Sequence, residues 1–349
     1  MPNEQPMTSA SAPAANPILI EVTRGGMIES RHRAAVAVVD AGGAMVGAWG
    51  DVERPVYGRS ALKPLQALPL IETGAADHYG LGAAEIALAC ASHSGEARHV
   101  ELVTQWLARI GCTADDLECG SHLPFHEASV EALILSGRKP DARYNNCSGK
   151  HAGFLTTSRH LGEATGGYIR YEHPVQQRIL GVFEQLTGLR LGDAPRGIDG
   201  CGIPVIGIPL GHTAMAMARL ADPDDHLPPA RATAAKRVLA AMASEPFLVA
   251  GSGRFCTKVM EIAGARVVLK TGAEGVYTAA LPTLGLGVAL KVDDGAGRAA
   301  EAAMGRILRR LKLLTADEER ALADELTPPV QNRVGRETGR VRVADDSPI

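Results

Sequence analysis

Residues 265–292 read ARVVLKTGAEGVYTAALPTLGLGVALKV, and this stretch decides the fold class. Its three apolar runs, ARVVLKTG, GVYTAALP and LGVALKV, have the composition of three consecutive β-strands. Similar short apolar runs lie near the N-terminus, at residues 18–24, 32–40 and 44–49, and the sequence AGG separates the second run from the third. Strands at both ends of one chain predict a single sheet that the two termini complete together.

Between these groups of strands the chain has helical patterns. Apolar residues at positions 62, 65, 68 and 71 form a helical stripe that Gly74 ends. Further helices are predicted at residues 83–90, 96–110, 126–136, 149–161, 173–187, 213–221, 229–243, 296–314 and 316–325. The tail is expected to form a last hairpin around GRETG, at residues 335–339. The predicted fold is therefore α/β, with a central, mostly antiparallel sheet flanked by helices and a mostly helical middle region.

These patterns divide the chain into parts with expected boundaries. Residues 1–17 lack a basic segment and a continuous apolar segment, so they are predicted to form a disordered leader rather than a signal peptide. The sheet part is expected at residues 18–60 and 264–344, and the helical part at 61–263. Residues 345–349 are expected to be a short tail.

Composition excludes several classes of function. The 349 residues have a formal net charge of -3 and only 4% aromatic residues, and no Lys/Arg block runs through them, which argues against nucleic-acid binding. No run of about 18 apolar residues exists, so no membrane span is expected. The six cysteines of a chain without a signal peptide are expected to be reduced thiols, and the cytoplasm is the expected location.

The sequence Ser60-Ala61-Leu62-Lys63 is an S-x-x-K motif at a predicted helix start. Residues three apart on a helix share a face, so Lys63 can reach Ser60. A serine hydroxyl becomes an effective nucleophile when a base takes its proton, and a lysine can do so when desolvation or a neighbouring cation lowers its pKa. Taken alone, the motif is also explained by a helix cap followed by a solvated lysine.

Two further motifs follow in an order that gives S-x-x-K more weight. Lys270-Thr271-Gly272 ends a predicted strand, and Ser92-His93-Ser94 follows an apolar helix. Serine β-lactamases and penicillin-binding proteins have S-x-x-K at a helix start, a middle motif with a serine, and K-T-G on a strand. The shared order and context predict a serine β-lactamase-like fold and an acyl-enzyme serine hydrolase. The middle motif reads SHS rather than SDN, which argues against β-lactam chemistry.

Two cysteines lie in polar, glycine-containing segments that are poorly explained as core. Cys147 is in Tyr-Asn-Asn-Cys-Ser-Gly-Lys-His, and Cys201 is in Gly-Ile-Asp-Gly-Cys-Gly. The two thiols could form a disulfide, bind a metal, or belong to an ordinary polar pocket. Reducing conditions argue against the disulfide, and zinc favours thiolate ligands. His151 and Asp199 are further candidate ligands by residue type.

Several of these segments together resemble one enzyme family. The segments SALKP, CASHSGE, NCSGKH, GIDGCG and KTGAEGVY, and the opening RGGMIESRHRAAVAVVDAGG, are similar to the type III L-asparaginases, the rhizobial inducible asparaginase family. The resemblance covers residues 18–344, and the fold of that family is similar to those of serine β-lactamases and glutaminases. It implies an amidohydrolase that converts L-asparagine to L-aspartate and ammonia, and a homodimer.

The resemblance also implies roles for particular residues. Ser60 would be the nucleophile and Lys63 its base, while Ser92 and Lys270 would relay protons. A Zn²⁺ ion would be held by Cys147, Lys150 and Cys201, with Asp199 and His151 as neighbours. Candidate substrate-binding residues are Arg59, His93, Ser148, Asp199 and Glu274. The competing hypotheses are another serine acyl-hydrolase of the β-lactamase or penicillin-binding type, and a binding protein that holds zinc without catalysis.

Overall fold

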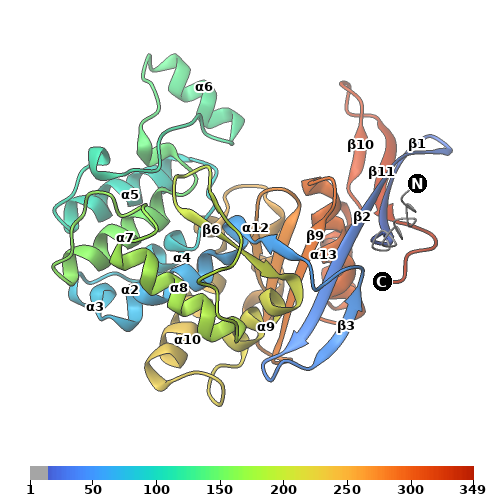
Figure 1. Cartoon of the computed structure of the whole chain (residues 1–349). Coiled ribbons are helices and arrows are strands. Elements are labelled where there is room, and N and C mark those ends of the chain that lie inside the picture. The colour runs from blue at the N-terminus through green and yellow to red at the C-terminus, as the bar shows by residue number, and fades with distance from the viewer. Residues whose placement is uncertain (1–14) are drawn as a thin grey trace, which may run out of the picture.

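The computed structural model describes residues 15–349, so the predicted leader lies almost entirely outside the described residues. The chain folds into a sheet-containing part and a helical part that lie side by side (Figure 1). The strands are β1 (Ile18–Arg24), β2 (Met27–Asp40), β3 (Met45–Trp49), β4 (Pro55–Tyr57), β5 (Arg196–Ile198), β6 (Pro204–Pro209), β7 (Val268–Thr271), β8 (Val276–Leu281), β9 (Leu286–Val292), β10 (Pro329–Gln331) and β11 (Glu337–Val343).

Helices fill the middle of the chain and flank the sheet. The α-helices are α1 (Lys63–Gln66), α2 (Leu68–Glu72), α3 (Ala75–His78), α4 (Ala83–Ala89), α5 (Ala97–Arg109), α6 (Glu127–Leu135), α7 (Ser148–His160), α8 (Pro174–Thr187), α9 (Leu210–Ala221), α10 (Pro229–Ser244), α11 (Pro246–Val249), α12 (Phe255–Ala263), α13 (Gly297–Arg310), α14 (Ala316–Ala321) and α15 (Ala323–Leu326). Short 3₁₀ helices are η1 (Arg59–Leu62), η2 (Ala114–Asp116), η3 (Ala142–Tyr144) and η4 (Gly264–Arg266). Within residues 15–349, no helix is long and apolar enough to span a membrane.

The main sheet combines strands from both ends of the chain. Its order is β10-β11-β1-β2-β9-β8-β7, with β3 also paired to β2. Every pair in this sheet is antiparallel. The long strand β2 pairs with β1 through its first half and with β9 and β3 through its second half. The predicted fold class, an antiparallel sheet built by the two termini and flanked by helices, is confirmed.

The two faces of the sheet are covered by different helices (Figure 1). Ala35 and Ala37 on β2 pack with Ala214 on α9, whereas the alternate residues Val36 and Val38 belong to the main core, which includes α13. This alternation follows the period of two in a β-strand. Helix α9 lies so close that a Cβ atom on Gly287 would be 2.0 Å from the carbonyl oxygen of Ala214, so only glycine fits there.

Two local features differ from the predictions. The expected helix over positions 62–71 is divided into η1, α1 and α2, because Pro64 and Pro69 each lie in the first turn of a new helix and cannot continue the preceding hydrogen-bond ladder. A second sheet of order β4-β6-β5 takes two of its three strands, β5 and β6, from the part expected to be helical. Its strands are three to six residues long, too short for a clear alternating pattern.

The packed chain extends slightly beyond the expected domain limits. Asn16 is buried, and its side-chain amide donates to Asp293 Oδ1 at 2.7 Å while its Oδ1 accepts from the Asp51 backbone N–H. At the other end, Ile349 is buried in the core and its carbonyl accepts a hydrogen bond from Arg306. Residues on both sides of the predicted 18–344 domain are therefore anchored to it.

Candidate active site

Three residues of the predicted motifs meet at one hydroxyl group. Ser92 Oγ lies 3.1 Å from Lys63 Nζ and 2.9 Å from Lys270 Nζ. Ser92 follows α4, Lys63 begins α1, and Lys270 is on β7, so three separate elements build this contact. All three side chains are buried, with 5% exposure for Ser92 and 1% or less for the two lysines. We call these residues the serine–lysine cluster.

Ser60, the predicted nucleophile, is three residues before Lys63 of this cluster. It is half-buried on η1, directly after Arg59, whose backbone φ of 49° is in the left-handed region. Left-handed backbone is costly for a residue with a side chain and is often found at functional sites. Lys63 Nζ bonds to Ser92 Oγ and to the carbonyl of Ala91 at 2.5 Å, and among residues 15–349 the Ser60 hydroxyl has no hydrogen-bond partner. The predicted pairing of Lys63 with Ser60 is therefore not made as a direct hydrogen bond.

The glycine of the K-T-G motif brings β7 against η1. A Cβ atom on Gly272 would lie 2.9 Å from the carbonyl oxygen of Gly58 and 3.2 Å from the nitrogen of Ala61. The hydroxyl of Thr278 on β8 donates to the Ala61 carbonyl at 3.0 Å. The strand therefore approaches the Ser60 segment closely enough for Lys270 to reach the cluster, and a side chain at Gly272 would prevent this approach.

Lys270 has a strongly perturbed ionisation. Burial lowers its pKa to about 7, and the positive charges of Lys63 and Arg254 act in the same direction. Desolvation disfavours the charged form of an amine, and neighbouring cations add to that effect. Lys270 is therefore partly neutral at pH 7 and can accept a proton, which suits general acid–base catalysis.

The cysteines of the second candidate site also meet a lysine. Lys150 Nζ lies 3.0 Å from Cys201 Sγ, and Cys147 lies close enough to exchange a hydrogen bond with Cys201. Cys147 precedes α7, Lys150 is in its first turn, and Cys201 follows β5. We call Cys147, Lys150 and Cys201 the thiol–lysine cluster. Asp199 Oδ2 lies 3.4 Å from Cys201 Sγ.

Charge is balanced inside the thiol–lysine cluster. The hydrogen bond from Cys201 and the charge of Lys150 hold the pKa of Cys147 well below the ordinary thiol value, although burial opposes this. Burial disfavours the charged form of Lys150, but the sulfur atoms and Asp199 raise its pKa above the usual range. The cluster therefore holds a thiolate beside an ammonium group.

The chemistry of this donor set fits a zinc ion. Zinc prefers thiolate and nitrogen ligands in a tetrahedral arrangement, and two thiols and one amine converge here. In the part of the chain that the structure describes, no group of three or more His, Cys, Asp or Glu side chains is arranged to hold a metal. A metal at this place would therefore need Lys150 as a neutral ligand in addition to the two cysteines.

An ion pair joins the two clusters. Arg59 Nε donates to Asp199 Oδ1 at 2.5 Å, and both side chains are largely buried. Because Arg59 precedes Ser60 and Asp199 contacts Cys201, the pair connects the predicted nucleophile with the thiol–lysine cluster. Arg59 and Asp199, two of the candidate substrate-binding residues, are therefore bound to each other.

His93 and Ser148 bind each other in the interior. The backbone N–H of Gly95 donates to His93 Nδ1, so the proton is on Nε2, which donates to Ser148 Oγ at 2.9 Å. The Ser148 hydroxyl in turn donates to the carbonyl of Arg143. Burial keeps the pKa of His93 well below its usual value, and His93 is therefore neutral. Both side chains hold the Ser92 segment against the start of α7.

The other two predicted residues lie in different surroundings. Glu274 is exposed in the turn between β7 and β8, with a left-handed φ of 57°, and its backbone carbonyl accepts a hydrogen bond from Lys291. His151 is fully buried, and its Nδ1 bonds to the hydroxyl of Tyr168 at 2.8 Å. His151 thus lies behind the thiol–lysine cluster, and Glu274 lies at the surface.

The structure adds residues that the motifs did not indicate. Cys119 is buried near Cys147 and Lys150, and burial raises its pKa to about 12, so it is a neutral thiol. Arg254, at the start of α12, lies near enough to Lys270 to affect its pKa. No motif surrounds Cys119, but the segment Gly251-Ser252-Gly253-Arg254, directly before a helix, is a signal for a functional loop.

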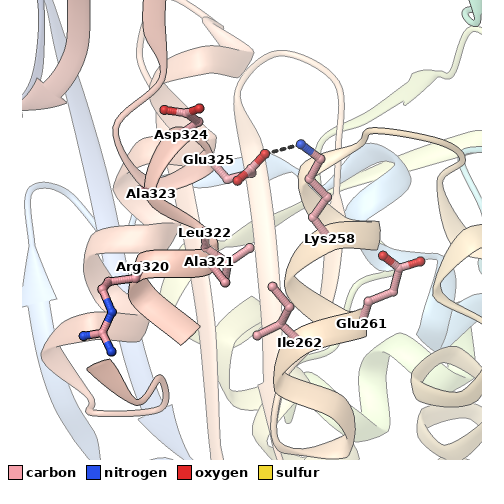
Figure 2. A pocket seen from close by; sticks show the side chains of 9 residues that line it. All are labelled: Lys258, Glu261, Ile262, Arg320, Ala321, Leu322, Ala323, Asp324 and Glu325. Atoms are coloured by element: carbon pink, nitrogen blue, oxygen red, sulfur yellow. Dashed lines mark hydrogen bonds and ion pairs between the residues drawn. The ribbon is translucent and has the colours of Figure 1, made fainter. Parts of the chain in front are cut away.

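One surface cavity is lined by none of the residues of these two clusters. It lies between α12 and the helices α14 and α15, and Figure 2 shows Lys258 bound to Glu325 across it. Arg320, on its rim, pairs with Asp317. Because these charged groups already have protein partners, they are a poor basis for ligand recognition.

A comparison with protein families shows to which class of protein this chain belongs. The chain matches the L-asparaginase II family over residues 20–343, nearly its whole length. The protein is therefore an amidohydrolase by family. More specifically, it belongs to the L-asparaginase II family, which confirms the resemblance inferred from the motifs. No curated protein sequence matches the chain.

Solved structures show a more distant similarity. The protein Mglu is 15% identical, with 82% of this chain and 68% of that chain covered and a TM-score of 0.45. Mglu in its L-glutamate binding form is 16% identical, with 82% and 62% covered and a TM-score of 0.42. A β-lactamase from Mycobacterium bovis is 15% identical, with 84% and 95% covered and a TM-score of 0.37.

Proposed function

We propose that this protein hydrolyses L-asparagine to L-aspartate and ammonia through an acyl-enzyme on Ser60. The observation that carries the proposal is the buried Ser92 hydroxyl held between Lys63 and Lys270 in a member of the L-asparaginase II family, with Ser60 three residues before Lys63. A serine needs a base to act as a nucleophile, and this arrangement supplies two amines linked by a hydroxyl.

The proposed reaction has two halves. In the first, the Lys63 ammonium passes a proton through the Ser92 hydroxyl to the neutral Lys270 amine, and Ser60 Oγ attacks the side-chain amide carbon and gives its proton to the neutral Lys63 that results. The tetrahedral intermediate collapses, the C–N bond breaks, and a lysine returns the proton so that ammonia leaves. In the second half, water loses a proton to the same amines and attacks the ester. Release of L-aspartate then restores the Ser60 hydroxyl.

We also propose that Cys147, Lys150 and Cys201 hold a zinc ion. When bound, zinc would supply a positive charge able to polarise or orient a substrate oxygen. The chain's own residues support this place, because Asp199 contacts Cys201 and binds Arg59 beside Ser60. Elemental analysis of the protein purified without chelators is expected to give about one zinc per chain, and Cys147→Ala is expected to remove it. A content below about 0.1 zinc per chain would contradict the zinc proposal.

Two further properties belong to the same proposal. A cytoplasmic location is supported by the cysteines at positions 90, 112, 119, 147, 201 and 256, all of which are buried and unpaired by disulfides. A homodimer is the assembly implied by the family resemblance. Light scattering of the purified protein tests the second property, and a monomer at all concentrations would contradict it.

The direct test is ammonia release from L-asparagine by the purified protein. Ser60→Ala is expected to reduce the rate by about a thousandfold or more while the protein stays folded. Ser244→Ala is a matched control, because Ser244 lies at the end of α10 and donates only to a backbone carbonyl. Absence of ammonia at millimolar asparagine, together with hydrolysis of a chromogenic cephalosporin, would favour the β-lactamase type instead.

A further inference from the structure

A second cavity is lined by residues from the segments that carry Ser94 and Arg254. Its volume is about 660 Å³, and its lining residues are Ser94, Phe125, His126, Glu127, Ala128, Ser252 and Arg254. Ser94 is two residues beyond Ser92, a distance of no more than about 7 Å between Cα atoms even in a fully extended chain. Burial lowers the pKa of Lys270, and Arg254 is near enough for its charge to lower it further, so two lining residues come from the surroundings of the serine–lysine cluster.

The segment that carries Arg254 is held firmly at the cavity wall. Glu96 accepts hydrogen bonds from the backbone N–H and the hydroxyl of Ser252, at 2.8 and 2.7 Å. Gly251 has a φ of 119°, and a Cβ atom there would lie 2.6 Å from both Glu96 and Ser94. These contacts fix the loop that leads into α12 and thereby fix the backbone of Arg254.

Arg254 itself has a free guanidinium group. The side chain is half-buried, and among residues 15–349 it makes no ion pair and no side-chain hydrogen bond, although Glu301 is near enough for the Arg254 charge to oppose the rise in pKa that burial causes at that carboxyl. A partly desolvated charge without a partner is unfavourable, and binding of an anion would relieve this. The neighbouring hydroxyls are already used as donors, since Ser94 donates to the carbonyl of Ala250 and Ser252 to Glu96. Arg254 is therefore a cationic donor without a hydrogen-bond partner that the cavity offers to a ligand.

The other arginine near the cluster is committed elsewhere. Arg59 is bound to Asp199 in a largely buried ion pair, so its use by a ligand would require that pair to open. L-Asparagine carries one carboxylate besides its reacting amide, and a planar guanidinium matches a carboxylate through two parallel hydrogen bonds. Of the two arginines, only Arg254 can make such a pair without breaking an existing one.

We propose that Arg254 binds the α-carboxylate of the amino-acid substrate and thereby selects substrates that carry this group. This inference rests on the proposed function for the identity of the substrate. The charge of Glu127 at the cavity rim is compatible with it, because an amino acid also carries an ammonium group. Arg254 is thus a specificity residue that contacts a part of the substrate remote from the bond that breaks.

The test compares two substrates that differ only in the carboxylate. L-Asparagine and 3-aminopropanamide share the amide and the amine, but only the first has the α-carboxylate. Arg254→Gln is expected to lower the ratio of kcat/KM for L-asparagine to kcat/KM for 3-aminopropanamide by about tenfold to a hundredfold. Arg254→Lys is expected to lower kcat/KM for L-asparagine less than Arg254→Gln does, because lysine keeps the charge but cannot make the two parallel hydrogen bonds. Arg98→Gln is the matched control, since Arg98 pairs with Glu245 at the surface.

The comparison separates substrate binding from an indirect effect. Loss of the Arg254 charge also affects Lys270, but that effect applies equally to both substrates and cancels in their ratio. An equal loss for both substrates would therefore overturn the proposal.

A binding experiment keeps this test separate from that of the proposed function. If the wild-type protein releases no ammonia from L-asparagine, the proposed function fails. Calorimetric measurement of L-aspartate and β-alanine binding then still tests whether Arg254 binds the α-carboxylate. Arg254→Gln is expected to weaken the binding of L-aspartate at least tenfold and to leave the affinity for β-alanine unchanged. Equal affinities of the wild-type protein and the variant for L-aspartate would overturn the inference, as would absence of binding to the wild-type protein.

Discussion

Lys270 and Lys150 are both buried lysines in polar clusters, yet their ionisation is shifted in opposite directions. The pKa of Lys270 is lowered to about 7 by burial and by the charges of Lys63 and Arg254. Burial acts on Lys150 in the same way, but the sulfur atoms of Cys147 and Cys201 reverse the result and raise its pKa. The neighbouring charges, rather than burial alone, decide whether a buried lysine is available as a base or held as a cation.

This difference suits the two clusters to different tasks. An amine that is partly neutral near pH 7 can take and return protons, as Lys270 would in the proposed reaction. An ammonium group paired with a thiolate is a stable unit, and it becomes a ligand only if a metal displaces its proton. Variants of the two lysines and their partners can therefore test the comparison separately.

The largest effect is expected on activity from Lys270→Met. Methionine fills a similar volume without an amine, so kcat/KM for L-asparagine should fall by about 10²–10⁴-fold. The melting temperature should not fall, because the buried amine is costly to keep in its charged form. Lys258→Met is the control, since Lys258 pairs with Glu325 rather than with a residue of the cluster. Full activity of Lys270→Met would show that Lys270 is not needed for proton transfer.

An intermediate effect is expected on stability from Cys147→Ala. This change removes the thiolate that pairs with the Lys150 ammonium and should lower the free energy of unfolding by about 3 kcal/mol, measured by urea denaturation with a chelator present. The double variant Cys147→Ala with Lys150→Met should recover part of the loss, because the ammonium that lost its partner is then absent. If the single variant were as stable as the wild type, the account of charge pairing in this cluster would be wrong.

The smallest effect is expected on kcat/KM of the wild-type protein when the pH is changed. As pH rises through about 7, Lys270 loses its proton and becomes able to accept one, so kcat/KM should increase with pH and level off above this value. Below it, the rate should fall by up to about tenfold per pH unit. The groups that act on Lys270 are Lys63, Arg254, Cys256 and Cys147, so Arg254→Gln should move the rising limb to higher pH. A rate that is constant from pH 5 to 9 would contradict the assignment.

The sequence predicted the overall sheet because its strands have clear apolar runs at both ends of the chain. It did not predict β4-β6-β5, whose strands are too short for a pattern, or the breaks that Pro64 and Pro69 introduce after Ser60. Short strands and proline-divided helices depend on tertiary contacts that no local pattern records.

Only some contacts of the candidate site could be predicted from the sequence, for a similar reason. Motif order indicated Ser92 and Lys270, which are in contact although 178 residues separate them. The sequence did not indicate that Lys63 bonds to Ser92 rather than to Ser60, or that Arg59 is bound to Asp199, because these contacts depend on how several elements pack. Arg254 follows a glycine-containing segment that could have been noticed in the sequence, but its unpaired guanidinium and its effect on Lys270 are seen only in the structure. The catalytic roles themselves remain predictions.

The central claim is that Ser60 forms an ester with the aspartyl group of the substrate. Acid quenching during the first turnovers with L-asparagine, followed by peptide mass spectrometry, tests it directly. The account predicts a mass increase of one aspartyl group on the peptide that contains Ser60, and none in Ser60→Ala. An aspartyl group on any other residue, or ammonia release at the wild-type rate by Ser60→Ala, would contradict it.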